Sequence, residues 1–258
     1  MKYRAVVAYD GTDFAGFQKQ ANARTVQAEL ERAVHQIVGR PTQVVGAGRT
    51  DAGVHATGQV VAFWAEWKHG EAVLLRALNA VLPSDIAVRC IAPCSERFHP
   101  RYDALSRTYE YVAYVDSVRQ PTRQRYALQL HQQPDVERMN AAARAIIGEH
   151  DFAAFGSSPS EREGATTVRR VLRAQWHAEG DTLRFVIEAN AFLYQMVRRI
   201  VHALLLVGDG RWSPEMLEQV LKSREPQQLQ GIAPAKGLCL VKVTYQEQYE
   251  ENQTVSHI

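Results

Sequence analysis

Cysteine is scarce in this chain of 258 residues, which holds only Cys90, Cys94 and Cys239. Three scattered cysteines do not make the paired framework that stabilises small secreted domains, so a reducing compartment is expected. Cys90 and Cys94 are spaced as C-x₃-C, but no second pair of cysteines or histidines follows at the spacing of a zinc site. The sequence therefore predicts neither a disulfide nor a bound metal.

Long apolar runs are absent as well. The longest one, residues 192–207, is interrupted by a glutamine, two arginines and a histidine. It is also shorter than the ~20 residues that a membrane span needs. The first residues, MKYRAVVAYDG, lack the apolar region of a signal peptide. These absences predict a cytoplasmic protein with no membrane segment.

An excess of charge of one sign is missing too, because 30 basic and 28 acidic residues leave a net charge of only +2. The distribution of the charges is more informative than their sum. Arginines gather in three groups, which are Arg97, Arg101 and Arg107, then Arg119, Arg123 and Arg125, then Arg169, Arg170 and Arg173. Such clusters are typical of a phosphate-binding face. Ordinary solvated surface charge explains them equally well, so nucleic-acid binding stays open at this point.

Strand and helix signals alternate along the chain without long apolar β runs. The pattern predicts strands at 4–9, 43–45, 59–63, 86–91, 108–115, 168–177, 182–189 and 238–245, with residues 179–181 joining two of them as a pair. It predicts helices at 26–37, 71–81, 135–147, 193–207 and from Pro214 onward. Thr25 is expected to cap the first helix, Gly39 and Pro41 to stop it, and Ser213 to cap the last one. An α+β fold with a mixed, mainly antiparallel sheet follows. We expect an N-terminal half at 1–104, a C-terminal half at 105–245, and a polar, frayed tail at 246–258.

The most informative segment is GAGRTDAGVH at 46–55. Its three glycines permit tight turns and close approach of a ligand, and between them stand one cation, one carboxylate and one imidazole. A dinucleotide-binding loop is excluded, since the third glycine of G-x-G-x-x-G and the helix after it are missing. A hairpin loop, with Asp51 in an Asx-turn and Arg49 solvated, explains the pattern about as well as a catalytic site does.

Two further features carry chemistry. Arg198 lies in the apolar helix predicted at 193–207, and a buried arginine there requires a carboxylate partner unless it extends to solvent. Arg199 next to it is expected to face outward. Tyr109 and Tyr111 share one face of the strand at 108–115. Two tyrosines on one face pack in a core or form a platform on which a base stacks.

Longer segments carry a resemblance to a known family. They are YDGTDFAGFQKQ at 9–20, GRTDAGVHATGQ at 48–59, FHPRYDALSRTYEYVAY at 98–114, ATTVRRV at 165–171, NAFLYQMVRRIV at 190–201 and PAKGLCLVKVTY at 234–245. Together they resemble the TruA-type pseudouridine synthases, which modify the anticodon arm of tRNA. The likeness extends over nearly the whole chain, and Phe17 stands where that family more usually has tryptophan.

The resemblance implies the pseudouridine synthase fold, in which a mixed central sheet is built from two similar halves flanked by helices. It also implies a homodimer whose tRNA partner spans both protomers. The activity implied is an isomerase that converts uridine to pseudouridine at tRNA positions 38, 39 and 40 without a cofactor.

The same resemblance implies roles for individual residues. Asp51 is the catalytic carboxylate, Tyr109 is the active-site tyrosine, and Arg198 is the charge partner of Asp51. Arg49 would fill the gap left by the flipped uridine, Arg169 would bind RNA, and Leu238 would pack near the uracil.

Two other classes of function stay open. A non-catalytic tRNA-binding or tRNA-folding protein would keep the arginine clusters, but it would not need Asp51, Tyr109 and Arg198 together. A hydrolase that used Asp51 as an acid or base would normally need a second catalytic carboxylate. No other Asp or Glu lies in a comparably distinctive motif. The three residues together favour the isomerase.

Overall fold

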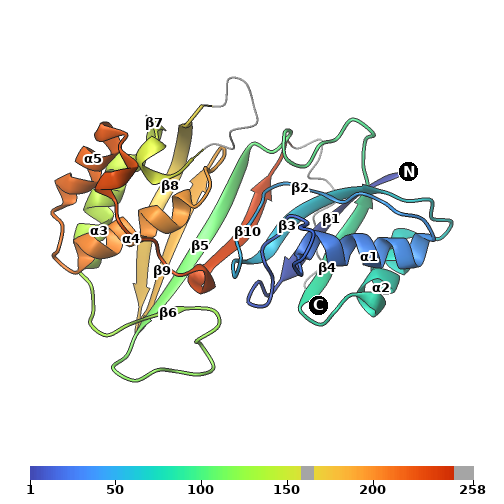
Figure 1. Cartoon of the computed structure of the whole chain (residues 1–258), viewed down its shortest axis with the longest axis horizontal. Helices are drawn as coiled ribbons and strands as arrows, with labels where there is room; N and C mark the ends of the chain where they lie inside the picture. Colours follow the sequence, from blue (N-terminus) through green and yellow to red (C-terminus); the bar gives the residue numbers. More distant parts are fainter. Residues whose placement is uncertain (158–165, 247–258) are drawn as a thin grey trace. The chain divides into compact units, whose positions relative to one another are not determined.

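The computed structural model describes residues 1–157 and 166–246, which form two compact units (Figure 1). Unit 1 comprises residues 1–105 and the segment that begins at Cys239, and unit 2 comprises Ser106–Leu238. The sequence places the last strand with the C-terminal half. The structure instead counts it with unit 1, because β10 (Leu238–Thr244) pairs with β3 (His55–Trp64). Apart from Gln246, the predicted polar tail lies outside the described residues.

Unit 1 contains a sheet in the order β4-β1-β3-β10, and a short strand, β2, pairs with β3. The further strands are β1 (Lys2–Tyr9), β2 (Val45–Gly46) and β4 (Ile86–Pro93). β1 runs antiparallel to both β3 and β4, whereas β10 runs parallel to β3. The sheet of this unit is therefore mixed and mainly antiparallel, as predicted.

Two helices, α1 (Val26–Val38) and α2 (Glu71–Val81), pack side by side in unit 1 (Figure 1). The side chain of Thr25 caps α1 by accepting a hydrogen bond from the backbone N of Ala28. Gly39, with φ 78°, ends the helix in the left-handed conformation that glycine adopts without strain. The start and stop signals that the sequence predicts for α1 are confirmed.

The strands of unit 2 follow the order β5-β9-β8-β7, with β6 parallel to β5. These strands are β5 (Ser106–Val115), β6 (Leu128–Leu130), β7 (Gly148–Asp151), β8 (Val168–Glu179) and β9 (Thr182–Ala189). The neighbours along this order are antiparallel. Gly180, with φ 58°, makes the turn of the predicted hairpin between β8 and β9. The α+β class is confirmed in both units.

Three helices of unit 2, α3 (Val136–Ala143), α4 (Met196–Gly208) and α5 (Pro214–Ser223), pack against one another. Short 3-10 turns lie at Arg144–Ile146, Ala153–Phe155, Pro226–Gln228 and Ala235–Gly237. Pro214 is the first residue of α5, as predicted, and Ser213 occupies the N-cap position. The side chain of Ser213 makes no capping hydrogen bond, so that part of the prediction is wrong.

Two helix boundaries also differ from the prediction. The helix expected at 135–147 is α-helical only to Ala143 and then tightens into a 3-10 turn. The helix expected at 193–207 begins at Met196, because Gln195 has a φ of 62° and cannot continue a right-handed helix. The shorter α4 is buried along almost its whole length, which is typical of a helix in a core.

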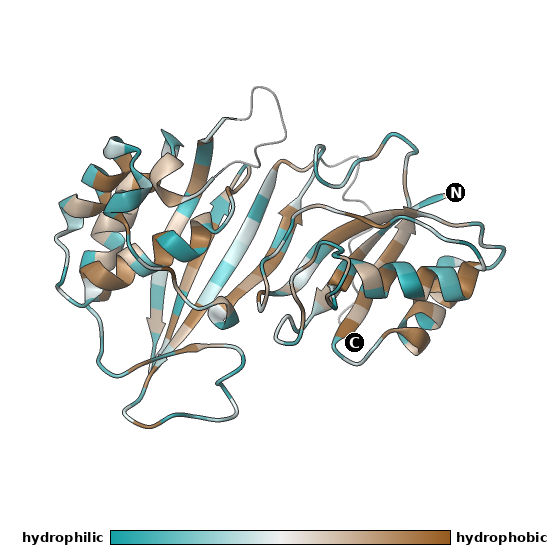
Figure 2. Cartoon of the chain, viewed as in Figure 1, coloured by the Kyte–Doolittle hydropathy of each residue, from teal (hydrophilic) through white to brown (hydrophobic). Residues whose placement is uncertain are grey.

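Hydrophobic residues follow the strands of each unit and form stripes on the helices, whereas the loops are largely hydrophilic (Figure 2). Leu74, Leu78 and Phe98 are among the large residues fully buried in unit 1, and Tyr111 and Trp176 are among those in unit 2. Within the described part of the chain, none of the helices has the length and apolar character needed to cross a membrane.

Candidate active site

Asp51 lies in the loop that connects β2 to β3, and it is half-buried. The loop turns between Asp51 and Val54, where the backbone N of Val54 donates to the carbonyl O of Asp51 at 3.2 Å. Gly53 adopts a φ of 76° within this turn. Because a side chain is strained at that φ, this glycine of the motif is a requirement of the backbone. The turn fixes the direction in which the side chain of Asp51 extends from the backbone.

The segment after β1 holds the Asp51 loop by backbone contacts. The backbone N of Phe17 donates to the carbonyl O of Thr50 at 3.0 Å, and the N of Gly53 donates to the O of Phe14 at 3.3 Å. Between these bonds, Gly16 has a φ of 100°, and a Cβ there would lie 2.8 Å from the O of Thr50. The two backbones can approach this closely only because residue 16 is glycine.

A buried network of hydrogen bonds connects the Asp51 loop to β1 and β3. The side-chain Oε1 of Gln59 accepts from the backbone N of Gly48 at 3.3 Å, and its Nε2 donates to the O of Gly48 at 2.9 Å. The same Nε2 lies 3.4 Å from the hydroxyl of Tyr9, which is 2.8 Å from the Oγ1 of Thr50. Burial raises the pKa of Tyr9 to about 12, so its phenol stays protonated and can donate to Thr50.

This network predicts that Gln59→Leu will destabilise the fold. Gln59 is completely buried, and leucine would leave the N and O of Gly48 without these partners. An unsatisfied buried polar group costs about 1–3 kcal/mol, so we expect a loss of free energy of unfolding in that range. Urea unfolding measures it, with the exposed Gln18→Leu as the matched control. Equal unfolding midpoints for the two variants would contradict the role of Gln59.

His55 anchors the end of the same loop at the start of β3. It is buried, and its Nδ1 accepts a hydrogen bond from the backbone N of Gly11 at 3.0 Å. The Oδ1 of Asp10 lies 3.2 Å from the same nitrogen and accepts a hydrogen bond from the backbone N of Thr12. The imidazole of the motif therefore ties the loop to the turn after β1. Arg49, by contrast, is exposed on the loop, two residues before Asp51.

In unit 2, Tyr109 and Tyr111 lie on one face of β5, which we call the tyrosine face, and Tyr109 is the predicted active-site tyrosine. Tyr109 is 8% exposed, and its ring meets that of Phe192 edge-on, with centroids 5.2 Å apart. Tyr111 is fully buried on the same face, and its hydroxyl donates to the O of Pro234 at 3.0 Å. Burial raises the pKa of Tyr111, and the charge of Arg198 opposes this shift.

Arg198 lies in the first turn of α4 and is half-buried. Its Nε donates to the O of Ala233 at 2.8 Å, and the backbone N of Ala233 donates to the O of Arg198 at 3.1 Å. Pro234, the residue after Ala233, accepts the hydrogen bond of the Tyr111 hydroxyl. The structure therefore brings Arg198 to the tyrosine face of β5. Leu238, 5% exposed, follows at the start of β10.

The structure corrects one expectation about an arginine and places a second arginine away from the tyrosine face. Arg199 was expected to face outward, but it is half-buried, and its Nε is buried without a hydrogen-bond partner among the described residues. The structure does not bring Arg169 to the tyrosine face. Arg169 lies on β8, where it pairs with His150 of β7. Across the intervening strand β9, Tyr109 aligns with Ala174 of β8, which is five residues further along that strand. The Nη1 of Arg169 donates to the O of Thr166 at 2.8 Å.

Sequence reasoning did not assign several residues that build the site. Tyr9, Gly16 and Gln59 lie inside the motifs at 9–20 and 48–59, and Phe192 lies inside the motif at 190–201. Their presence in these motifs was the available signal. Their roles depend on contacts between segments far apart in the chain, which a linear pattern does not show.

A family model described as tRNA pseudouridine synthase matches residues 5–103 and 142–246. The chain belongs to the tRNA pseudouridine synthase family. The two matched segments contain Asp51 and Arg198, together with Arg49, Arg169 and Leu238, whereas Tyr109 lies between them. The resemblance predicted from the sequence motifs is thereby confirmed at the level of the family.

Relatives named tRNA pseudouridine synthase A match this family member along nearly its whole length. The protein of Paraburkholderia phymatum is 42% identical over 94% of this chain and 90% of its own. That of a Geobacter species is 41% identical over 95% and 98%, and that of Limosilactobacillus fermentum is 41% identical over 95% and 96%. A chain of a solved archaeal box H/ACA Nop10–Cbf5 complex is 12% identical over 91% of this chain and 59% of its own, with a TM-score of 0.32.

Proposed function

We propose that this protein isomerises uridine to pseudouridine in tRNA, at positions 38, 39 and 40 of the anticodon stem-loop, with Asp51 as the essential carboxylate. The observation that carries the proposal is Asp51 itself, half-buried in a loop that the network of Tyr9, Thr50 and Gln59 holds in place. The reaction breaks the N1–C1′ bond, rotates the uracil and rejoins it through C5. All atoms are retained, so neither a redox cofactor nor an energy source is needed.

The proposed roles divide between the two units. Asp51 supplies a nucleophile or a stabilising negative charge, and Arg198 keeps that carboxylate ionised by charge pairing. Tyr109 stacks on the uracil or transfers a proton at C5, and its contact with Phe192 supports a fixed ring orientation. A base must leave the helical stack before this chemistry, and the exposed Arg49 beside Asp51 fills the gap. Leu238 packs near the uracil.

Mass spectrometry of an unmodified tRNA treated with the pure protein tests the proposal. We expect pseudouridine at positions 38, 39 or 40 and no change elsewhere. The assay is run after chelation, in a monovalent-salt buffer that keeps the tRNA folded, because no step needs a metal. Tight tRNA binding with no pseudouridine would indicate a non-catalytic tRNA-binding protein instead. Activity that returned only on addition of zinc would contradict the proposed chemistry.

Binding of tRNA should depend steeply on salt although the net charge is only +2. Each phosphate contact adds roughly 0.7–0.9 to the slope of log K against log salt. We expect Arg169→Ala to weaken binding and to reduce that slope by about one contact. Arg184→Ala is the control, because Arg184 is already paired with Glu110. A flat salt dependence, or equal slopes in wild type and Arg169→Ala, would remove Arg169 from the RNA-binding surface.

We also infer a homodimer in the cytoplasm. Family resemblance supports the dimer, and the small number of scattered cysteines is consistent with a reducing compartment. Light scattering of the purified protein tests the dimer, and a mass corresponding to one chain would exclude it.

A further inference from the structure

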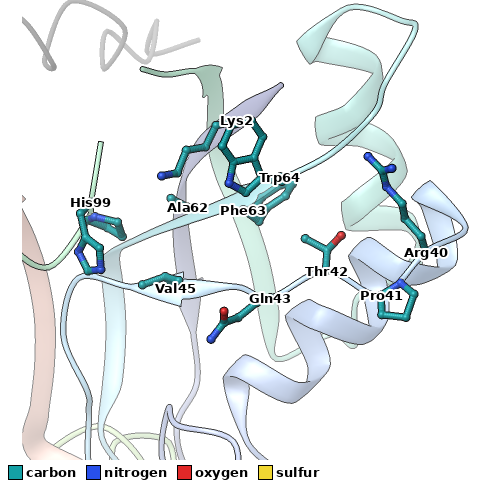
Figure 3. A pocket seen from close by; sticks show the side chains of 11 residues that line it. Lys2, Arg40, Pro41, Thr42, Gln43, Val45, Ala62, Phe63, Trp64 and His99 are labelled. Carbon is teal, nitrogen blue, oxygen red and sulfur yellow. The ribbon is translucent and has the colours of Figure 1, made fainter. Parts of the chain in front are cut away.

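Unit 1 contains a pocket of about 470 Å³ at the end of β3 remote from Asp51 (Figure 3). Pockets for small ligands commonly enclose roughly 300–1,000 Å³, so this one can hold a nucleotide. His55 begins β3 beside the Asp51 loop and Trp64 ends it. Ala62 is the nearest lining residue on β3, and the seven residue steps between it and His55 at ~3.3 Å each span roughly 23 Å along the strand. The pocket is therefore distinct from the proposed active site.

The charge of the pocket is positive. Lys2 and Arg40 line it, and among the described residues that form its wall none is acidic. The ammonium of Lys2 donates to the carbonyl oxygens of Glu96 and Phe98, at 2.9 and 2.7 Å, which leaves one of its three N–H groups for a ligand. Arg40 pairs with Glu66 at 2.8 Å, but both side chains are at least half exposed, so this ion pair is weak and exchangeable.

A large exposed aromatic ring completes the pocket. Trp64 is 44% exposed, and the ammonium of Lys2 lies 5.7 Å from the centre of its ring. In Figure 3, Lys2 and Trp64 lie together on one side, Arg40 extends from the end of α1 on the other, and Gln43 lies on the segment leading to β2. Gln43 is exposed, so its amide can donate to and accept from the edge of a base.

We propose that this pocket binds a nucleotide of the RNA substrate other than the uridine that is modified. Its base stacks on Trp64, one of its two flanking phosphates replaces Glu66 as the partner of Arg40, and the other contacts Lys2. A planar ring and an exposed amide match the base of a nucleotide, two cations match the phosphates, and stacking on an aromatic accepts any base. That the nucleotide belongs to tRNA rests on the proposed function.

The experiment uses the full-length protein and follows tryptophan fluorescence during titration with tRNA. We expect tRNA to quench the signal in wild type and in Trp67→Phe, since Trp67 does not line the pocket. Trp64→Phe should keep the dissociation constant within about threefold, because phenylalanine still stacks, but it should lose most of the quenching. Trp64→Leu should raise the dissociation constant by about five- to a hundredfold.

Arg40→Gln should also weaken binding, and it should reduce the salt slope by roughly 0.7–0.9. The matched control is Arg32→Gln on α1, the helix that precedes Arg40, since the side chains of Arg32 and Arg40 are 52% and 50% exposed. Turnover should stay unchanged in the two control variants, Arg32→Gln and Trp67→Phe, since neither residue lines the pocket. The binding measurements do not depend on turnover. A protein that bound tRNA but made no pseudouridine would contradict the proposed function, and the same titrations would still test the pocket.

Three results would overturn the proposal. One is unchanged tRNA affinity in both Trp64→Leu and Arg40→Gln. Another is saturable quenching by free AMP that tRNA does not displace, which would indicate a site for a free mononucleotide. The third is a change of molar mass in Trp64→Leu measured by light scattering, which would make the pocket a contact between two copies of this chain.

Discussion

Asp51→Asn is expected to lower the rate of pseudouridine formation at least about a thousandfold, while tRNA affinity stays within about threefold. Asparagine keeps the volume of the side chain but can neither attack carbon nor carry negative charge, and loss of a covalent catalytic group typically costs this much or more. A thousandfold loss corresponds to about 4 kcal/mol of barrier. Affinity is spared because RNA binding rests mainly on phosphate contacts, which a carboxylate does not make.

Single-turnover assays measure the rate, and filter binding measures affinity on the same preparations. Asp13→Asn is the matched control, since Asp13 is an exposed carboxylate in the segment that holds the Asp51 loop. We expect this variant to retain wild-type turnover. If Asp51→Asn kept more than about a tenth of the wild-type rate, only ~1.4 kcal/mol of barrier would be involved, and another group would have to be the essential one.

Local chemistry explains which parts of the fold the sequence predicted. The ends of α1 rest on the hydroxyl of Thr25 and the left-handed φ of Gly39, both of which act within a few residues. The turn at Gly180 is local in the same way. Such signals depend on the intrinsic preferences of the residues concerned, so they can be read without knowing what packs nearby.

The boundaries that the prediction missed depend on distant contacts. The periodicity of α4 continues back to Leu193, but the backbone N of Tyr194 donates to the O of Ser157 at 3.2 Å. This bridge to a distant segment coincides with the left-handed Gln195, and the helix starts only at Met196. The pairing of β10 with β3 joins residues more than 180 positions apart, and no local pattern specifies it.

The candidate site also has features that the sequence predicts and others that depend on distant contacts. Asp51 stands out in a linear motif, because it is the single carboxylate of the segment GAGRTDAGVH. The role of Gln59 in holding the loop depends on the hydrogen bonds from its amide to both backbone groups of Gly48, and a linear pattern does not show these bonds. A sequence therefore indicates which groups perform chemistry more readily than which groups hold them in place.

Arg198→Met is expected to lower turnover at least about a hundredfold, because the proposal makes Arg198 the charge that keeps Asp51 ionised and oriented. Methionine keeps much of the bulk and the helix propensity of arginine but removes the charge. Arg198→Lys should retain more activity, since a point charge survives although the fixed fork of the guanidinium is lost. Turnover and urea unfolding are measured on the same set of variants.

The choice of control follows from the structure. Arg199 has a buried Nε, so its replacement disturbs packing and is not a neutral comparison. Arg211, just after α4, is 64% exposed and pairs with Asp209 at 3.5 Å. Arg211→Met should therefore leave both the turnover and the free energy of unfolding close to wild type.

A double-mutant cycle decides whether Arg198 and Asp51 act on each other. Arg198→Met also breaks the hydrogen bond from Nε to the O of Ala233, but this loss occurs with and without Asp51→Asn and cancels in the cycle. If the two charges are partners, each single change leaves the other charge poorly compensated, and the double variant loses less stability than the sum, by about 0.5–3 kcal/mol. If the losses add within about 0.5 kcal/mol, Arg198 is not the partner of Asp51, and its contacts with Ala233 are a structural link between α4 and the segment that binds Tyr111.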